Sequence, residues 1–167
     1  MGKYSASDTS DLGSIRLSIV VSRFNETITS ALLDGALNEC DRRGVTRDRI
    51  DVFYIPGALE IAVVAKECAV RGADAVVCLG AVVKGDTPHF EYVANTAALS
   101  IAEVATSTGV PCIFGVLTVE NEAQALERIG GAQGHKGEEA AATAIDTIRA
   151  LREVEAAFSG KSTGFLS

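Results

Sequence analysis

The sequence predicts a doubly wound α/β fold, in which a parallel sheet of four strands lies between two layers of helices. Short apolar runs rich in β-branched residues alternate along the chain with longer segments that repeat apolar residues at helical spacing. One of these runs, AVVCLG at 75–80, is apolar throughout, which is typical of a strand buried on both faces. This alternation favours one parallel sheet with helices on both sides, a three-layer α/β/α architecture.

The first half of the chain supplies two strands and two helices. LSIVV (17–21) is the first predicted strand, and the helix after it is expected to end at the Arg-Gly pair 43–44. A basic last turn followed by glycine is a common helix end. DVFYI (51–55) is the second strand. The Pro-Gly pair 56–57 ends it, and helical spacing then continues to a second Arg-Gly pair at 71–72.

The second half repeats the pattern. The third strand (75–80) leads through a polar loop into a long amphipathic helix, whose apolar positions run from 90 to 104. PCIFGVLT (111–118) is the fourth strand. A short helix, a glycine-rich loop (130–137) and a last helix (138–155) complete the chain. The inward-facing positions of that last helix are predicted to be Ala140, Ala144, Ile148 and Leu151.

These elements fit one domain at 15–155. A chain of 167 residues can bury one sizeable core but is short for two. Residues 1–14 form a polar N-terminal arm without the apolar segment of a secretory signal. Residues 156–167 are expected to be a poorly ordered C-terminal tail.

Composition argues against several classes of partner. The formal net charge is −7 and tryptophan is absent, whereas nucleic-acid binders usually present a basic face and aromatic platforms. No apolar run reaches the roughly 18 residues of a membrane span. Four cysteines, at 40, 68, 78 and 112, lie in apolar segments without a C-x-x-C pair. They are expected to be core residues of a protein in the reducing cytoplasm, with a metal or redox site as the alternative.

The loops that follow the strands are the candidate functional segments. In a doubly wound sheet, ligands bind beyond the carboxyl ends of the strands. This rule selects the loops at 22–27, 56–60, 80–89 and 118–121, with the glycine-rich loop as a further contributor. No nucleotide-binding loop, metal-ligand spacing or nucleophile elbow is present in the sequence.

The loop Gly85-Asp86-Thr87-Pro88-His89 carries one of only two histidines. Thr87 is a good N-cap and Pro88 a good first helical residue, so His89 is expected in the first turn. Free N–H groups at a helix start suit a phosphate, and the imidazole there could transfer a proton. Asp86 could contribute only its backbone N–H. The alternative is a simple capping loop with a solvated histidine.

Four more side chains can be interpreted either as functional residues or as ordinary structural ones. Phe24 could stack on a planar ligand or simply pack. Glu60 is favoured in the first turn of any helix, and Arg128 suits any helix end, although a phosphate clamp is the more specific reading. Lys136 on its own reads as a loop charge.

Taken in order, several segments resemble the lumazine synthase family of the riboflavin pathway. They are SRFN (22–25), PGALEI (56–61), LGAVVKGDTPHFEYV (79–93), FGVLTVEN (114–121), ALERIGG (125–131) and HKG (135–137). The similarity runs from about residue 15 to about 152. It implies a flavodoxin-like fold and the condensation of 5-amino-6-(D-ribitylamino)uracil with 3,4-dihydroxy-2-butanone 4-phosphate. The products are 6,7-dimethyl-8-ribityllumazine, phosphate and water, and the family uses no metal and no organic cofactor.

The resemblance also implies roles for individual residues. His89 matches the proton-transfer residue of the family. Those that match contacts with the ribitylaminouracil are Phe24, Ala58, Leu59, Glu60, Ala81, Val82, Val83, Phe114 and Lys136, the last two reached from a neighbouring subunit. Those that match contacts with the butanone phosphate are Asp86, Thr87 and Arg128. Lys84, Ala62 and His135 stand where the family more often has Arg, Pro and Asn.

The resemblance implies a homo-oligomer as well. Family members are homopentamers, some of which close into icosahedral shells that can enclose riboflavin synthase. The N-terminal arm is expected to add a strand to the sheet of an adjacent subunit. Two rival readings stay open: a non-catalytic flavodoxin-like module that binds FMN or a phosphorylated ligand, and a shell scaffold without activity.

Overall fold

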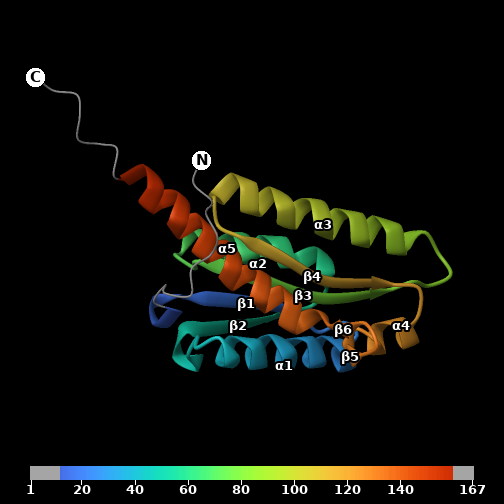
Figure 1. Cartoon of the computed structure of the whole chain (residues 1–167). Helices are drawn as coiled ribbons and strands as arrows, with labels where there is room; N and C mark the ends of the chain where they lie inside the picture. The colour runs from blue at the N-terminus through green and yellow to red at the C-terminus, as the bar shows by residue number, and fades with distance from the viewer. Residues whose placement is uncertain (1–11, 160–167) are drawn as a thin grey trace, which may run out of the picture.

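A four-stranded parallel sheet forms the centre of the chain, as predicted. The computed structural model describes residues 12–159, and Figure 1 shows the sheet between its helices. The strands lie in the order β2-β1-β3-β4, and every neighbouring pair is parallel. Their bounds are β1 Leu17–Ser22, β2 Ile50–Ile55, β3 Ala75–Val83 and β4 Cys112–Val119.

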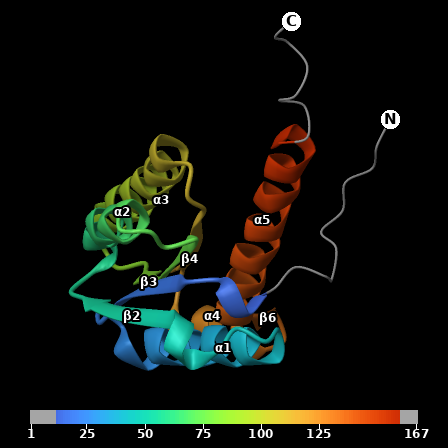
Figure 2. The ribbon, with the colours of Figure 1, turned by 90° about the vertical axis from the view of Figure 1, so that its left-hand side faces the viewer.

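Helices cover both faces of this sheet. Figure 2 shows α2 (Ile61–Val70) and α3 (His89–Thr108) together on one side. The other side carries α1 (Glu26–Arg42), α4 (Glu122–Leu126) and α5 (Lys136–Ser159). Three short 3₁₀ helices precede β1, β2 and α2, namely η1 (Leu12–Ser14), η2 (Arg47–Arg49) and η3 (Ala58–Glu60). The predicted three-layer α/β/α architecture is therefore confirmed.

The two central strands carry the core. All six residues of β1 are buried, and so are the first seven positions of β3. Because successive side chains of a strand point to opposite faces, β1 contributes to both apolar layers. Ile19 and Val21 pack in the layer of α1 and α5, whereas Val20 packs in the layer of α2 and α3. This is the pattern that the continuous apolar runs predicted.

The structure corrects several predicted boundaries. The third strand continues beyond 80, since its pairing with β4 extends to Val83 and Val119. The last helix begins at Lys136 and ends at Ser159, so residues 156–159 are helical where a tail was predicted. Leu151 was predicted to face inward and is instead 44% exposed. Figure 1 shows that the C-terminal part of α5 extends beyond the sheet, so helical spacing there no longer implies a buried face.

The glycine-rich loop also contains regular structure. Residues 129–131 (β5) and 134–135 (β6) form a small antiparallel hairpin next to α4. The predictions for the N-terminal arm and for the end of the tail fall on residues 1–11 and 160–167, which lie outside the described residues.

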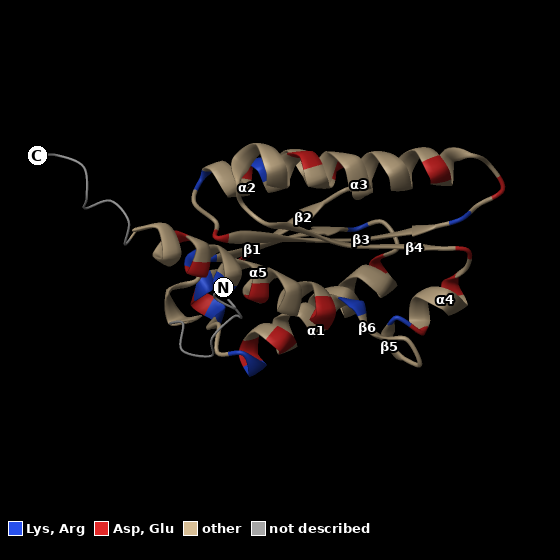
Figure 3. Cartoon of the chain, turned by 45° about the horizontal axis from the view of Figure 1, so that its top comes forward, with Lys and Arg blue, Asp and Glu red and all other residues tan. Residues whose placement is uncertain are grey.

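Ion pairs join α1 to α5. The carboxylate of Glu39 is buried and accepts hydrogen bonds from Arg42 and Arg43. Arg43 also bonds to Asp146 at 2.6 Å, and Arg42 to Glu138 at 3.1 Å. Basic and acidic segments accordingly lie side by side at this end of the molecule in Figure 3. Within residues 12–159, no helix has the length and apolar character needed to cross a membrane.

Candidate active site

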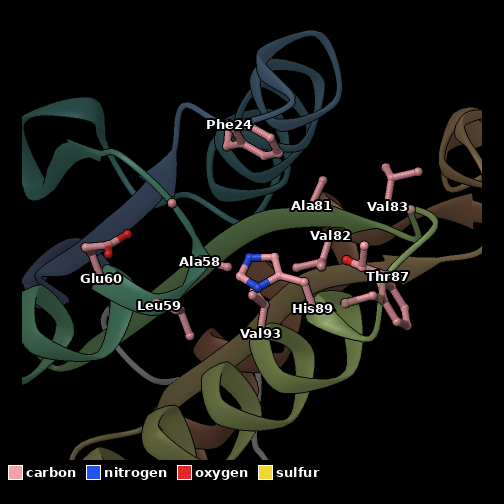
Figure 4. Close-up of a pocket in the computed structure, with 13 residues that line it drawn as sticks. Phe24, Ala58, Leu59, Glu60, Ala81, Val82, Val83, Thr87, His89 and Val93 are labelled. Atoms are coloured by element: carbon pink, nitrogen blue, oxygen red, sulfur yellow. The ribbon is translucent and has the colours of Figure 1, made fainter.

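A cavity of ≈ 380 Å³ opens at the carboxyl ends of β1 and β3 (Figure 4). The chain continues from β1 to β2 on one side and from β3 to β4 on the other, so this point is the topological switch of the sheet. The cavity has the size of an ordinary small-molecule site. Its lining residues are Phe24, Gly57, Ala58, Leu59, Glu60, Ala81, Val82, Val83, Gly85, Thr87, His89, Phe90 and Val93.

Phe24 forms the wall that follows β1. Phe24 is 70% exposed, whereas hydrogen bonds to the end of β2 hold the backbone at this point. The N–H of Arg23 donates to the carbonyl of Ile55 at 2.8 Å, and the N–H of Phe24 donates to the carbonyl of Pro56 at 3.1 Å. The loop thus continues the pairing of β1 with β2 past the strand ends. It presents an aromatic face that is free to stack on a flat ligand.

The short 3₁₀ helix η3 and the end of β3 form two further parts of the lining. Ala58 is buried, whereas the side chains of Leu59 and Glu60 are exposed. Figure 4 shows Glu60 and Leu59 on the side of η3 and Ala81–Val83 along the strand. The pairing of β3 with β1 ends at Leu79, so in the described part of the chain the main chain of Val82 and Val83 has no strand partner on that side and can meet a heterocycle.

His89 is the first residue of α3 and lines the cavity together with Thr87. In Figure 4 its imidazole reaches from the helix start toward the end of β3 and Ala58. The prediction that Thr87 caps this helix is wrong, because Pro88 occupies the cap position and no side chain caps α3. The N–H groups of His89 and Phe90 therefore remain available to an anion, whereas that of Glu91 donates to the carbonyl of Pro88 at 3.1 Å.

Lys84 adjoins this loop and is held by β4. Its N–H donates to the carbonyl of Val119 at 2.9 Å, and its ammonium lies 2.9 Å from the carboxylate of Glu120. The hydrogen bond to Glu120 raises the pKa of Lys84. The cation is therefore already paired within the protomer.

The remaining predicted residues lie elsewhere on the protomer. Phe114 and Lys136 line a separate cavity of ≈ 300 Å³ between β4 and α5. Arg128 turns its guanidinium back onto α4, where it donates to the carbonyl of Gln124 at 2.8 Å. Asp86 is exposed and does not line the first cavity. One protomer thus brings together the aromatic wall, the strand end and His89, but neither of the two expected cations.

Arg128 and Lys136 nevertheless belong to one unit. The N–H of Lys136 donates to the carbonyl of Arg128 at 2.8 Å across the base of the β5–β6 hairpin. The ammonium of Lys136 is paired with Glu139 at 2.7 Å. The hairpin therefore holds both cations on the same edge of the molecule.

Sequence reasoning missed Asn25, whose amide donates to the carbonyl of Ala81 at 2.9 Å. It lies within the quoted segment SRFN, but nothing in the residue pattern indicates its bond to a strand 56 residues away. The four cysteines are buried and free, as predicted. Burial raises the pKa of the Cys40 and Cys112 thiols to about 11. Among the described residues, no group of His, Cys, Asp and Glu is arranged to hold a metal ion.

The parallel sheet, the cavity at its switch point and the imidazole beside a helix start define an α/β protein with a small-molecule site. The sequence profile of the 6,7-dimethyl-8-ribityllumazine synthase family matches residues 14–152. A relative from Protochlamydia amoebophila (strain UWE25), named 6,7-dimethyl-8-ribityllumazine synthase, is 46% identical over 139 residues, which are 83% of this chain and 81% of the relative. The chain belongs to the 6,7-dimethyl-8-ribityllumazine synthase family.

One solved structure is also similar, a de novo designed Rossmann fold protein with 16% sequence identity and a TM-score of 0.37. The match covers 70% of this chain and 98% of the designed protein.

Proposed function

We propose that the cavity at the ends of β1 and β3 is the active site of a lumazine synthase. The reaction condenses 5-amino-6-(D-ribitylamino)uracil with 3,4-dihydroxy-2-butanone 4-phosphate, and it releases 6,7-dimethyl-8-ribityllumazine, phosphate and water. Membership of the family supports the activity. The observation that supports the location is that loops from three distant parts of the chain line one cavity, with Phe24, η3 and His89 each exposed to it.

The ribitylaminouracil would occupy the part of the cavity lined by Phe24, residues 58–60 and Ala81–Val83. The ring of Phe24 would stack on the pyrimidine, while backbone groups of Ala81–Val83 read its polar edge. Residues 58–60 would hold the ribityl chain, with the carboxylate of Glu60 as an acceptor for its hydroxyl groups. Most of this recognition uses backbone and apolar surface, which suits a flat neutral ring.

The butanone phosphate belongs at the start of α3. The amides of Asp86 and Thr87 and the free N–H groups of the first helical turn would bind its phosphate. A cation is still required there, and Arg128 of the same protomer does not line the cavity. We therefore assign the cationic partner to the Arg128 of a neighbouring subunit, which would release its bond to Gln124 and form a bidentate pair with the phosphate.

The chemistry requires proton transfers rather than a strong protein nucleophile. The amino group of the uracil attacks the ketone and forms a Schiff base with loss of water. Phosphate is then eliminated, the ribitylamino nitrogen attacks the remaining carbonyl to close the ring, and a second water leaves; each step moves a proton. His89 lies where it can accept and return these protons. Holding the two substrates side by side supplies much of the acceleration, since proximity alone is worth up to about 7–11 kcal/mol.

Assembly would complete the site. The cavity of Phe114 and Lys136 lies on another part of the protomer, as expected if these residues face the ring-binding cavity of an adjacent copy. We propose a homopentamer, in which the N-terminal arm adds a strand to a neighbour. The outer edge of β2 has no strand partner among the described residues and suits that addition. Closure into an icosahedral shell, which could enclose riboflavin synthase, is the extended form of this proposal.

We further propose that the catalytic domain spans residues 15–155 and that the enzyme acts in the cytoplasm. Four free buried thiols suit a reducing compartment.

Mixing the purified protein with both substrates tests the proposed function. We expect the fluorescent lumazine to form in step with phosphate release. A non-catalytic binding module would bind FMN or a phosphorylated ligand and form no product, and a scaffold would assemble and form no product. Sedimentation analysis of the same sample would separate monomer, pentamer and shell.

A further inference from the structure

Asn25 has a backbone conformation that no other non-glycine residue shares within 12–159. Its φ of 60° and ψ of 48° lie in the left-handed region. Asparagine tolerates this region better than most residues, although such conformations still cost energy and cluster at functional sites. Asn25 is also the N-cap of α1, yet its side chain makes no capping bond. Its side chain is therefore committed to something other than the helix that it begins.

That other partner is the end of β3. The amide Nδ2 donates to the carbonyl of Ala81 at 2.9 Å. The last pair between β1 and β3 is Val21 with Leu79, whereas β3 continues to Val83 along β4. The Asn25 amide thus supplies a hydrogen bond to the part of β3 that extends beyond β1. This is the part that lines the cavity.

Phe24, the residue before Asn25, is held by the loop that precedes η3. The N–H of Phe24 donates to the carbonyl of Pro56, which precedes η3. Residues 24 and 25 therefore tie together two parts of the cavity lining, the loop before η3 and the end of β3. The exposed Phe24 ring has no polar group of its own, so the backbone on either side sets its place.

We propose that Asn25 is a positioning residue for the flat-ring substrate. Its amide fixes the distance between the Phe24 ring and the backbone of Ala81–Val83, and its left-handed backbone turns the chain from Phe24 into α1. This inference rests on the proposed function, because it assumes that the ring substrate occupies the space between these two walls.

Two substitutions separate the amide from the backbone conformation. Asn25→Gly keeps access to left-handed φ but removes the amide, and Asn25→Asp keeps the shape but places an acceptor against the Ala81 carbonyl. Asn38→Gly is the matched control, because Asn38 is exposed in the same helix, away from the cavity. It weakens α1 by helix propensity alone.

The loss of one hydrogen bond is expected to raise the KM and the Kd for ribitylaminouracil about 2- to 10-fold in Asn25→Gly. The KM for the butanone phosphate should change less than about twofold. Asn25→Asp should weaken ring binding further, since two acceptors then face each other. Asn38→Gly should lower the melting temperature and leave both KM values at the parent level. A purely structural asparagine would lower the melting temperature in both Asn25 variants and leave the KM for the ring substrate at the parent level.

The measurements are steady-state kinetics with each substrate varied and calorimetric titration of ribitylaminouracil alone. If the parent protein forms lumazine but both Asn25 variants keep its KM and Kd for the ring substrate, the positioning role is overturned and the proposed function is not. A parent that neither bound the ring substrate nor formed lumazine would overturn the proposed function, and this inference with it.

Discussion

Replacing Gly137 with alanine should destabilise the fold more than the same replacement at any other glycine in the loops and helix starts near the site. Gly137 is buried in the first turn of α5, directly against α1. A Cβ atom there would lie 2.0 Å from the carbonyl oxygen of Leu32 and 2.8 Å from its carbonyl carbon. These are backbone atoms in the middle of a helix, so no side-chain rotation can relieve the clash.

The two helices would have to separate by about 1 Å to reach normal contact distances. Leu32 is fully buried, and the layer between α1 and α5 includes Ala141 and Ala144, so the shift would open space along the whole contact. Overpacking of this kind costs about 1–3 kcal/mol, and a rigid backbone obstacle places Gly137→Ala toward the upper end. For a chain of this size, each kcal/mol lowers Tm by roughly 2–4 °C. A fall of roughly 4–12 °C is therefore expected.

Thermal unfolding followed by circular dichroism at matched chain concentration measures the effect, since assembly would make Tm depend on concentration. Gly85→Ala is the control for stability, because its Cβ would meet no atom within 4 Å and its φ is not left-handed. Its Tm should stay near the parent or rise slightly, as restricting the unfolded chain is mildly stabilising. A Gly137→Ala variant with the Tm of the parent would refute the steric argument.

Three further predictions concern the chemistry and its environment. His89→Ala should lower kcat by roughly 10²–10⁴ yet leave measurable lumazine, because substrate proximity remains; complete loss in a folded variant would contradict this. Arg128→Ala should raise the KM for the butanone phosphate and leave the KM for ribitylaminouracil unchanged. An unchanged KM for the butanone phosphate would exclude a role of Arg128 in binding its phosphate group. Burial raises the pKa of Cys40 to about 11, so its protonated form is favoured in the folded state. The buried neutral thiol therefore contributes at most ~3 kcal/mol to the free energy of unfolding. This contribution is present below about pH 9 and is lost as the pH rises through about 11. Denaturant titrations at pH 8 to 11 should show this decline, and Cys40→Ala should reduce it.

The sheet was predictable because its signal is local and repeated. LSIVV is a short apolar run and AVVCLG is typical of a strand buried on both faces, and the helical spacing between the strand segments favours a parallel arrangement. The ends were less predictable. β3 continues to Val83, as the apolar run AVVCLGAVV does, whereas the prediction ended the strand at Gly80. Leu151 has helical spacing but is 44% exposed, because spacing alone does not show where a helix loses its contact with the sheet.

The site was predictable to the extent that parallel strands end at one edge. That rule selects the loops of Phe24, residues 58–60 and His89, which all line the cavity, and also the loop at 118–121, which does not. The rule does not predict which way a long side chain points, and Arg128 turns toward Gln124 instead of the cavity. Thr87 was assigned as a cap from its residue type, whereas the proline after it takes that position.

The residues that we propose to meet the substrates differ in their contacts from those that fix the distances between elements. Phe24 and His89 are exposed, so substituting either changes what the cavity can bind or protonate and leaves the packing beneath it intact. Asn25 and Gly137 contact backbone instead, at the Ala81 carbonyl and the Leu32 carbonyl. Such contacts set the spacing of whole elements, because a main-chain atom moves only with its strand or helix. At Asn25 such a contact joins the loop of Phe24 to the end of β3, so we expect the fold to accept different side chains around the cavity while this contact keeps the two parts of the lining together.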